Sequence, residues 1–323
     1  MANLNVAVIG ALEYAKYLGK KSTTSDITFY DLKQDETTVS FVEPTKYPEK
    51  LASLFFATTL ADAAVVVVEQ IGPAFGESLI MLDCLGIRKG FIVLKNYITT
   101  EQLAPLVKGT VLEGYAVVED NPVQLREKLL QMANESQTGA GQDSGIRSGS
   151  VAVDHFFDVR GVGTVVLGCV AEGIIRKHDS AKVFPTELSA EIRSIQKHDD
   201  DFDIAVKGDR VGLALKGVSV DDLDRGTVLT NNDNVVRSQE IAGRGHMVKY
   251  WLNPLKEGMV LHIGHWMQFE PARVESVSYV GDSRTPDIRL RLQKDLVYLR
   301  GSKAVMTYLE GGKLRVVGTI ELD

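Results

Sequence analysis

The hydrophobic pattern of the chain changes once, near residue 137, and this change constrains the fold more than any other feature. Before it, apolar strand-like runs such as NVAVIG and AAVVVVE alternate with helical stretches such as KYPEKLASLFFATTLAD. Such alternation predicts a doubly wound, mostly parallel α/β sheet, with ligands at the carboxyl ends of its strands. After it, β-branched runs are broken by glycine turns about every 8 to 12 residues, which predicts two antiparallel β-barrels.

A segment of low complexity separates the two patterns. ESQTGAGQDSGIRSGS, residues 135–150, is rich in Gly, Ser and Gln and has no apolar periodicity, so it is interpreted as a linker. A second break near TNNDNVV divides the two predicted barrels. We therefore expect an α/β domain, a linker and two barrels at 1–137, 138–149, 150–231 and 232–323.

Composition excludes several classes of protein. The 323 residues are 44% hydrophobic and 24% charged, as in ordinary globular proteins. Cys84 and Cys169 lie far apart in unlike contexts, which argues against a disulfide framework and fits a cytoplasmic protein. His262 and His265 point to opposite faces if LHIGHW is a strand, so we expect no metal there. No apolar run approaches the roughly 20 residues of a membrane helix, and the opening MANLNVAV lacks a signal peptide, so we expect neither membrane insertion nor export.

The net charge of −7 hides a difference along the chain. Lysine and arginine exceed aspartate and glutamate only in residues 237–323, by 13 to 10. Affinity for phosphates follows clustered cations rather than a bulk sum, so this excess alone does not predict a nucleic-acid surface. We expect no DNA partner.

GALEYAKY, residues 10–17, follows the first apolar strand and precedes a helix-like stretch. It keeps Gly10 and Lys16 in the spacing of a phosphate-binding loop, G-x-x-x-x-G-K-[ST], but Ala15 replaces the second glycine and Tyr17 the hydroxyl residue. Such loops need glycine where backbone N–H groups approach phosphate, and a hydroxyl on Mg²⁺. Two readings stay open: a degraded nucleotide site, or a plain strand-turn-helix junction with an exposed lysine.

Two long strings carry a resemblance to a known family. VDHFFDVRGVGTVVLGCVAEGIIRKHD, residues 153–179, and GDRVGLALKGVSVDDLDRGTVL, residues 208–229, resemble the second domain of translational GTPases of the elongation factor Tu superfamily. The similarity is strongest to SelB-like factors, including those of pyrrolysine-using methanogenic archaea. It implies a G-domain-like segment followed by two barrels.

The resemblance gives each nucleotide motif a definite requirement. The family loop GHVDHGK[TS] aligns from Gly10 onward. Its D-x-P-G-H motif, which holds magnesium-bound water and positions the hydrolytic water, is similar in place to Glu43–Tyr47. Glutamate still reaches a metal's water shell, but Tyr47 cannot copy the histidine that orients the attacking water. The segment between Lys16 and Glu43 is also shorter than the family normally uses.

The guanine-reading motif N-K-x-D falls on Lys95–Ile98, with Asn96 and Ile98 at its second and last positions. The family aspartate accepts two hydrogen bonds from guanine, whereas Ile98 accepts none. The resemblance thus predicts that guanine-nucleotide binding and GTP hydrolysis are weakened or lost, and that no cofactor is needed. The alternative is a site that still takes GTP or GDP with Mg²⁺.

In the family, the second domain, which is the first of its two barrels, receives the aminoacylated end of tRNA. Positions that line its aminoacyl pocket fall on Asp154 and Phe157, which keep the usual residue types. His155 replaces an acidic residue and Leu167 a threonine. The resemblance therefore implies a pocket with one polar group fewer and an added imidazole.

Cations on the predicted barrel strands are candidate RNA contacts. An A-form stem hides the major-groove edges of its bases, so shape, phosphates and 2′-hydroxyls are what a protein contacts. Long cationic side chains suit phosphates, although on a barrel they are also ordinary surface residues. The candidates are Arg193, Lys197, Arg289, Arg291 and Arg315.

Three functions are consistent with these features. The first is a SelB-like factor that binds aminoacyl-tRNA, with the ribosome as a further partner and a non-standard amino acid such as pyrrolysine as cargo. Its G domain is then a scaffold rather than a working enzyme. The second is an active GTPase elongation factor with an irregular phosphate loop. The third is a scaffold that uses its barrels for protein contacts and binds no RNA.

Overall fold

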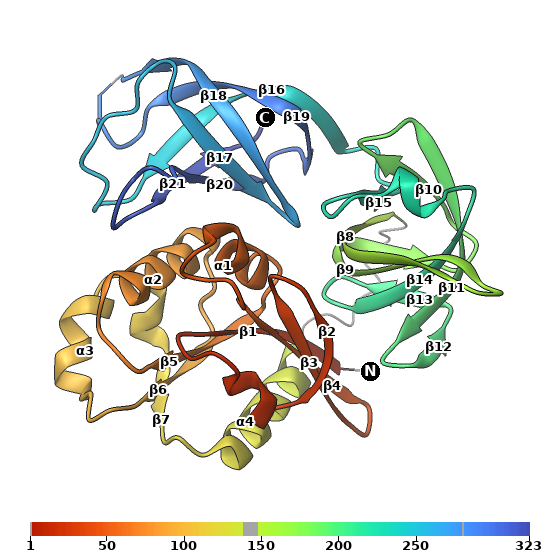
Figure 1. Ribbon diagram of the computed structural model, residues 1–323, viewed down its shortest axis with the longest axis horizontal. Coiled ribbons are helices and arrows are strands. Elements are labelled where there is room, and N and C mark those ends of the chain that lie inside the picture. Colours follow the sequence, from red (N-terminus) through yellow and green to blue (C-terminus); the bar gives the residue numbers. More distant parts are fainter. Residues whose placement is uncertain (1, 138–147, 280) are drawn as a thin grey trace. The chain divides into compact units, whose positions relative to one another are not determined.

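The computed structural model describes residues 2–137, 148–279 and 281–323 (Figure 1). The chain forms two compact units. One comprises Met1–Gln142 with Lys313–Arg315, and the other Asp143–Gly312 with Val316–Asp323. Most of the predicted linker, residues 138–147, lies outside the described residues.

The first unit is built on a seven-stranded sheet of order β2-β3-β4-β1-β5-β6-β7. The pairs from β4 to β7 are parallel, whereas β2 and β3 form an antiparallel edge. The strands are β1 Ala2–Ile9, β2 Lys20–Thr24, β3 Thr28–Gln34, β4 Thr37–Glu43, β5 Ala63–Val68, β6 Gly90–Leu94 and β7 Ala116–Val118. This arrangement confirms the predicted α/β sheet.

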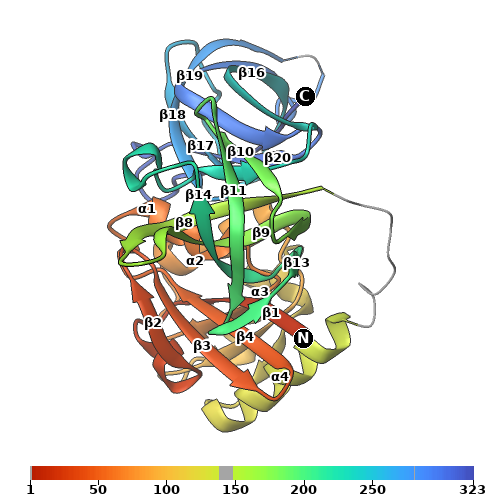
Figure 2. The same ribbon diagram turned by 90° about the vertical axis from the view of Figure 1, so that its right-hand side faces the viewer.

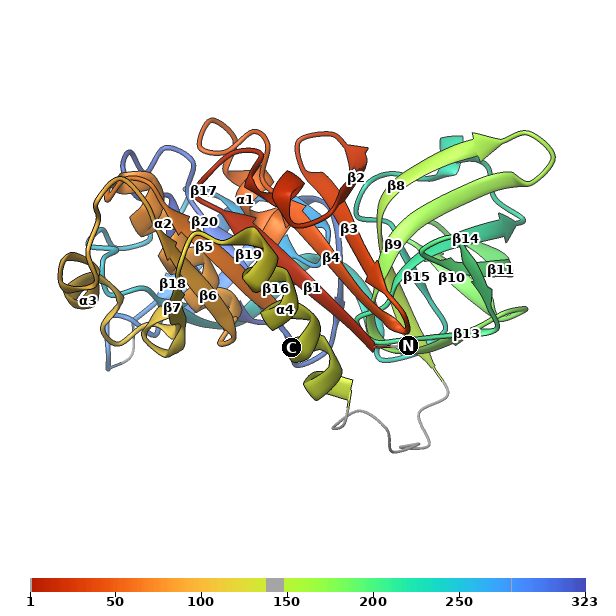
Figure 3. The same cartoon turned by 90° about the horizontal axis from the view of Figure 1, so that it is seen from below.

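Helices cover both faces of this sheet. Leu125, Leu129 and Ala133 of α4 share a buried cluster with Val6 and Val8 of β1, and α4 crosses β1 on that face (Figure 3). Helices α1 and α2 lie on the other face (Figure 1). None of the helices in the described residues is long and apolar enough to cross a bilayer. The helices are α1 Leu51–Thr58, α2 Pro73–Leu85, α3 Thr100–Val107 and α4 Pro122–Gln137, with short 3₁₀ turns η1 Tyr14–Tyr17 and η2 Val111–Gly114.

The prediction of a helix after GALEYAKY is wrong. The chain makes only the four-residue turn η1 there and then enters β2, which pairs with β3 through Lys20↔Asp31 and Lys21↔Tyr30. The sequence KKSTT has no apolar residues at helical spacing, and its threonines favour an extended chain. A strand at the sheet edge therefore stands where a phosphate loop normally leads into a helix.

The second unit begins with a closed antiparallel barrel. Its ring runs β10-β15-β8-β9-β14-β11 and is closed by pairing of β10 with β11 (Figure 2). Val151, Val166 and Leu213 are among the residues of its core. The strands are β8 Gly149–Val159, β9 Gly163–Arg176, β10 Ser180–Phe184, β11 Leu188–Lys197, β12 Asp200–Phe202, β13 Ile204–Val206, β14 Arg210–Lys216 and β15 Val228–Thr230, and a 3₁₀ turn η3 spans Val220–Asp222.

The last barrel is also closed and antiparallel, in the order β16-β19-β18-β17-β20-β21. Along β19, Ile288, Leu290 and Leu292 are buried in the core, whereas Arg289 and Arg291 are exposed. This period of two is what a strand with one buried face requires. The strands are β16 Val235–Met247, β17 Val260–His265, β18 Gln268–Ser278, β19 Asp287–Leu299, β20 Lys303–Thr307 and β21 Val316–Glu321. The two predicted barrels are confirmed.

Candidate functional site

The loop that follows β1, residues 10–13 and here called the β1 loop, begins with a glycine that sterics require. Gly10 has φ of +99°, and a Cβ atom there would lie 2.0 Å from the carbonyl oxygen of Val67 in β5. Only glycine fits such a position. Glu13 is left-handed, with φ of 61°, and leads into η1. Gly10 therefore has a structural reason to be present that does not depend on any nucleotide.

Glu43, the last residue of β4, turns its carboxylate toward this loop. The Ala15 N–H donates to Glu43 Oε1 at 3.3 Å, and the neighbouring N–H groups of Glu13 and Tyr14 also act to lower the pKa of this carboxyl. The Tyr30 hydroxyl donates to Oε2 at 3.5 Å. The side chain is buried, and burial raises its pKa above the ordinary value although the hydrogen bonds act in the opposite direction. We call the three N–H groups the amide cradle.

A left-handed residue followed by helical ones points successive N–H groups into one concavity, which is an anion-binding shape. In phosphate loops such a concavity holds the phosphates of the ligand. In this chain it holds a side chain of the protein itself. The candidate site is therefore occupied at its centre by Glu43.

The neighbouring part of the site is filled by Tyr14. Its ring is buried, and its hydroxyl donates to Asp120 Oδ1 at 2.8 Å. Lys95 places its ammonium 5.0 Å from the centre of the Tyr14 ring and 3.6 Å from carboxylate oxygens of both Asp120 and Glu69. Burial and then the Asp120 carboxylate raise the pKa of the Tyr14 phenol, so it stays a neutral donor. The cluster joins η1 to the segments that follow β6 and β7.

The other residues of the predicted motifs have partners or positions of their own. Asn96 has φ of 52° and donates from its side chain to the Glu69 carbonyl at 3.0 Å. Ile98 is partly buried. The Tyr47 hydroxyl donates to the Ala74 carbonyl at 2.8 Å, and burial raises its pKa. Tyr47 thereby braces the segment after β4 against the start of α2.

Lys16 and Tyr17 point away from the amide cradle. The Lys16 ammonium pairs with Glu13 Oε2 at 2.8 Å, and 47% of the lysine side chain is exposed. Tyr17 is 56% exposed, whereas Ala15, the residue just before Lys16, is fully buried in the core. The structure thus separates the three residues that the loop motif groups together.

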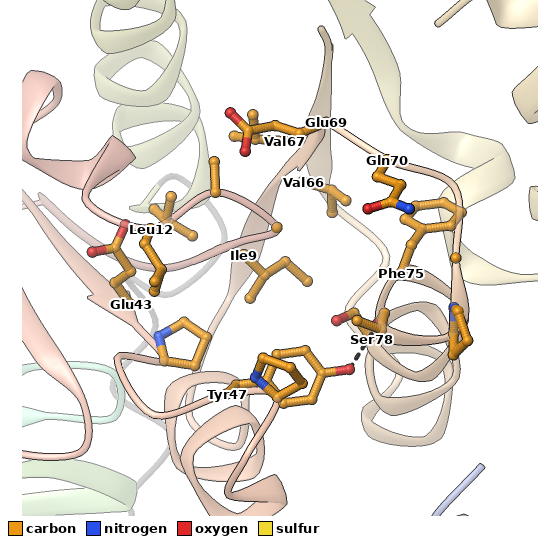
Figure 4. A pocket seen from close by; sticks show the side chains of 18 residues that line it. Ile9, Leu12, Glu43, Tyr47, Val66, Val67, Glu69, Gln70, Phe75 and Ser78 are labelled. Carbon is orange, nitrogen blue, oxygen red and sulfur yellow. Dashed lines mark hydrogen bonds between the residues drawn. The ribbon is translucent and has the colours of Figure 1, made fainter. Parts of the chain in front are cut away.

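A cavity of about 500 Å³ lies beside Glu43 (Figure 4). The β1 loop, the segment after β4 and the start of α2 form its wall, which is mostly apolar and includes Ile9, Leu12 and Phe75. Its charged lining residues are Glu43 and Glu69, and within the described residues no lysine, arginine or histidine lines it. A phosphate in this cavity would meet two carboxylates and no cation, which is an unfavourable environment.

In the first of the two barrels, Asp154 forms a buried ion pair. Arg210 donates two hydrogen bonds to its carboxylate, one of them from Nη2 to Oδ1 at 2.9 Å. His155 Nδ1 lies 2.5 Å from the same Oδ1. Burial opposes ionisation of Asp154, but the charge and hydrogen bonds of Arg210 outweigh it and hold the pKa below its ordinary value. Asp154 therefore positions its neighbours rather than facing solvent.

The remaining aminoacyl candidates share one face of the β8–β9 hairpin, the long pair of strands visible in Figure 3. His155 lies opposite Leu167 in the strand register, and Phe157 lies two residues further along β8. Phe157 is 41% exposed, whereas the adjacent Phe156 packs on the barrel core. We call His155, Phe157 and Leu167 the hairpin face. The structure brings these predicted residues together.

Arginines cluster on the outer face of the last barrel. Arg291 pairs with Glu240 and lies directly opposite Arg273 of β18, while Arg289 lies opposite Ser276. Arg273 and Arg289 are exposed, and neither forms an ion pair within the described residues. We call Arg273, Arg289 and Arg291 the arginine face.

The other predicted cations lie in different settings. Arg193 is exposed on β11. Lys197 is buried, with its ammonium 2.5 Å from Asp209 Oδ2 and over the Phe202 ring. Arg315, which groups with the first unit, binds the buried Glu77 through its backbone N–H and its guanidinium, at 2.6 Å for the closest pair. The charges of Lys197 and Arg315 are thus already matched by carboxylates.

Three residues of the site were missed from the sequence. Tyr14 and Asp120 are 106 positions apart, and nothing local pairs them. Arg273 becomes adjacent to Arg291 only through a register that shifts at a bulge after Val274. A tyrosine next to the position of a missing loop glycine is a signal that could have indicated a filled site. No group of three or more His, Cys, Asp or Glu side chains is placed to hold a metal in the described parts of the chain.

Known proteins share this architecture. The family model described as elongation factor Tu domain 2 matches residues 163–230. Over its whole length the chain is similar to an uncharacterised protein of Methanocaldococcus jannaschii, with 36% identity over 324 residues that cover 100% of each. A selenocysteine-specific elongation factor of that organism is 26% identical over 304 residues, covering 88% of this chain and 64% of the factor. The chain therefore spans less than two thirds of that relative.

Solved structures give the same result for the fold. The translation elongation factor SelB of Methanococcus maripaludis in its apo form superposes with a TM-score of 0.79 at 22% identity, covering 99% of this chain and 79% of that one. Its complex with the GTP analogue GppNHp superposes with a TM-score of 0.80 at 22% identity, covering 100% and 79%.

Proposed function

This chain belongs to the SelB-like elongation factors of the elongation factor Tu superfamily, and we propose that it binds aminoacyl-tRNA while its guanine-nucleotide binding and GTP hydrolysis are weakened or lost. The selenocysteine-specific relative is an elongation factor by name. A chain with the same two barrels and a filled first domain is suited to hold tRNA without a nucleotide cycle.

The observation that carries the loss of nucleotide binding is the occupied cleft. GTP would have to displace Glu43 from the amide cradle and also move the buried Tyr14 ring with its Asp120 hydrogen bond. Both side chains are part of the fold, so removing them exposes buried groups and lowers stability. A ligand that must first undo native contacts loses that free energy from its affinity.

The chemistry of the cleft supports the same conclusion. The SelB relative of M. maripaludis is solved with a bound GTP analogue. In this chain Lys16 pairs with Glu13 at the surface, and the cavity beside Glu43 is lined by carboxylates without a cation. Ile98 offers no acceptor for guanine. These features disfavour a triphosphate at three separate positions.

The arginine face supports the proposed RNA contact. Like charges directly opposite each other on neighbouring strands destabilise a sheet, and Arg273 and Arg291 are such a pair, although the ion pair of Arg291 with Glu240 offsets part of their repulsion. An anion bound between them would remove this repulsion. RNA phosphates along an A-form stem are such anions, and they are contacted by shape and charge rather than by base sequence.

The hairpin face supports a proposal about the cargo. His155, Phe157 and Leu167 offer an imidazole, an exposed ring and an aliphatic chain in one place. Such a face suits an aminoacyl side chain with an extended apolar body and a polar end. We include in the proposal a non-standard amino acid such as pyrrolysine as the cargo.

Filter binding of tRNA to the full chain tests this function. We expect aminoacyl-tRNA to bind more tightly than deacylated tRNA, with the same affinity in GTP, GDP or no nucleotide, and with binding that weakens as salt rises. Binding that requires GTP and Mg²⁺ would instead identify an active GTPase factor. No binding at about 50 mM salt, where phosphate contacts are strongest, would contradict an RNA partner and favour a protein-interaction scaffold.

A further inference from the structure

Glu43 is buried, and its hydrogen-bond partners in the described residues are the Ala15 N–H and the Tyr30 phenol rather than a lysine or arginine. A buried carboxylate is costly unless hydrogen bonds satisfy it. The amide cradle does so with N–H groups that would otherwise be left without acceptors. Carboxylate and cradle therefore depend on each other.

The contact links two segments that a bound nucleotide usually links. On one side is the β1 loop with η1. On the other is the segment 44–50, which continues from Glu43 and leads into α1. In nucleotide-dependent switches the terminal phosphate bound at the loop is what orders the second segment, and its loss releases that segment.

We propose that Glu43 is a built-in anionic ligand of the amide cradle, which holds segment 44–50 in one arrangement as a terminal phosphate would, without any nucleotide. This inference rests on the proposed function, in which the cleft no longer takes GTP. It adds that the first domain is fixed in one state by its own side chain. It also assigns the cradle as a site for small oxyanions once the Glu43 carboxylate is removed.

Segment 44–50 is also held by two hydrogen bonds that do not involve Glu43. The Lys46 N–H donates to Ser53 Oγ at 3.1 Å, and the Tyr47 hydroxyl donates to the Ala74 carbonyl at 2.8 Å. These hydrogen bonds fix the segment to α1 and α2. None of them connects it to the β1 loop, so Glu43 supplies that connection.

The space around Glu43 allows a replacement ligand to enter. The cavity of about 500 Å³ reaches Glu43 and the β1 loop (Figure 4). In a Glu43→Ala variant the cradle loses its carboxylate while the cavity gives acetate or inorganic phosphate a route to the freed N–H groups. Anions bind readily at such concavities.

Hydrogen–deuterium exchange on the full chain tests the proposal. Glu43→Ala should speed exchange in residues 11–18 and 44–50 by about tenfold or more, because hydrogen bonds to a charged group are lost. Glu43→Gln keeps one acceptor and should give a smaller increase. Glu49→Ala removes an exposed glutamate of the same segment and serves as the matched control, with unchanged exchange expected.

Acetate or inorganic phosphate at about 50 mM, with ionic strength held constant by chloride, should restore slow exchange in Glu43→Ala but leave the wild type unchanged. Unchanged exchange in Glu43→Ala, or faster exchange that neither anion reverses, would overturn the proposal. If Glu43→Ala does not fold, Glu43→Gln decides: exchange equal to the wild type contradicts the role of the charge. None of these readouts involves RNA, so tRNA binding can fail independently of them.

Discussion

The first domain and the last barrel differ in how far their polar and charged side chains are paired within the chain. In the first domain, hydrogen bonds within the chain satisfy Glu43 and the Tyr14 hydroxyl, through the Ala15 N–H and Asp120 respectively. On the last barrel, Arg273 and Arg289 form no ion pair within the described residues, and Arg291, directly opposite Arg273 on the neighbouring strand, pairs with Glu240. Polar groups that are hydrogen-bonded or ion-paired within the chain stabilise the fold. Charged side chains without such a partner can bind another molecule.

The two regions therefore have different roles, one in stability and the other in binding. The first domain is a doubly wound sheet, and the side chains that fill its cleft contribute to the stability of the fold. The barrels keep the exposed surfaces. A substitution in the cleft should therefore change stability more than binding, and a substitution on the arginine face should do the reverse.

Replacement of Tyr14 is expected to have the largest effect on stability. Replacing it with alanine removes a buried ring and should lower the free energy of unfolding by about 3 to 5 kcal/mol. Tyr14→Phe keeps the ring but loses the Asp120 hydrogen bond, and should cost about 1 kcal/mol. Urea denaturation of both variants measures this. A Tyr14→Ala protein as stable as the wild type would show that the ring does not fill the cleft.

The next largest effect is on the pH dependence of stability, through the buried imidazole of His265 in the last barrel. His265 is fully buried, and burial lowers its pKa to about 4. The folded state thus disfavours the imidazolium. The contribution of neutral His265 to the free energy of unfolding is therefore complete above pH 6.5 and is lost as the pH falls toward about 4. The difference between wild type and His265→Asn should change by about 3 kcal/mol across that window.

Denaturation at several pH values checks this prediction, with His178→Asn as the control because that imidazole is exposed. A stability difference that stays constant from pH 7 to 4 would mean that His265 is protonated inside the barrel. The interior of the barrel would then tolerate charge as its outer face does.

A smaller effect is expected on the arginine face. Replacing Arg273 and Arg289 with alanine should weaken tRNA binding about tenfold near 0.1 M salt and reduce the salt slope by roughly 1 to 2. Arg273→Ala alone should stabilise the fold by a few tenths of a kcal/mol, because it removes a like-charge pair. Arg244→Ala is the control, since Arg244 already pairs with Asp287. An unchanged salt slope would exclude this face from the RNA contact.

The smallest effect is expected for Lys16→Ala. Its ammonium pairs with Glu13 at the surface, away from the amide cradle. The affinity for tRNA should therefore stay within about twofold of the wild type. A large loss in filter binding would show that Lys16 still holds a phosphate and that the cleft is not closed.

Sequence patterns predicted the architecture well and the state of the cleft only in part. Alternating strands and helices, and later the glycine-punctuated strands, follow from local periodicity, and the structure confirms them. The erosion of the loop motif at Ala15 and Tyr17 is also local. The contacts that fill the cleft were not predictable, because Tyr14 meets Asp120, and Ala15 meets Glu43, only after the sheet forms.

Two further differences have the same origin. The stretch after Tyr17 became a strand because pairing with β3 outweighed any helical tendency of a polar segment. The side-chain direction of Lys197 could not be derived from its type, since a lysine on a barrel strand is usually exposed; here Asp209 satisfies its charge inside. Tertiary partners decided both cases.

The central claim is that side chains of the protein itself occupy the guanine-nucleotide cleft. Isothermal titration of GTP into the full chain with Mg²⁺ tests it most directly, with GDP and ATP titrated alongside. We predict no saturable heat up to about 1 mM nucleotide, a concentration that would reveal any affinity better than about −4 kcal/mol. Saturable binding of GTP below that concentration, lost when Mg²⁺ is removed, would contradict the claim.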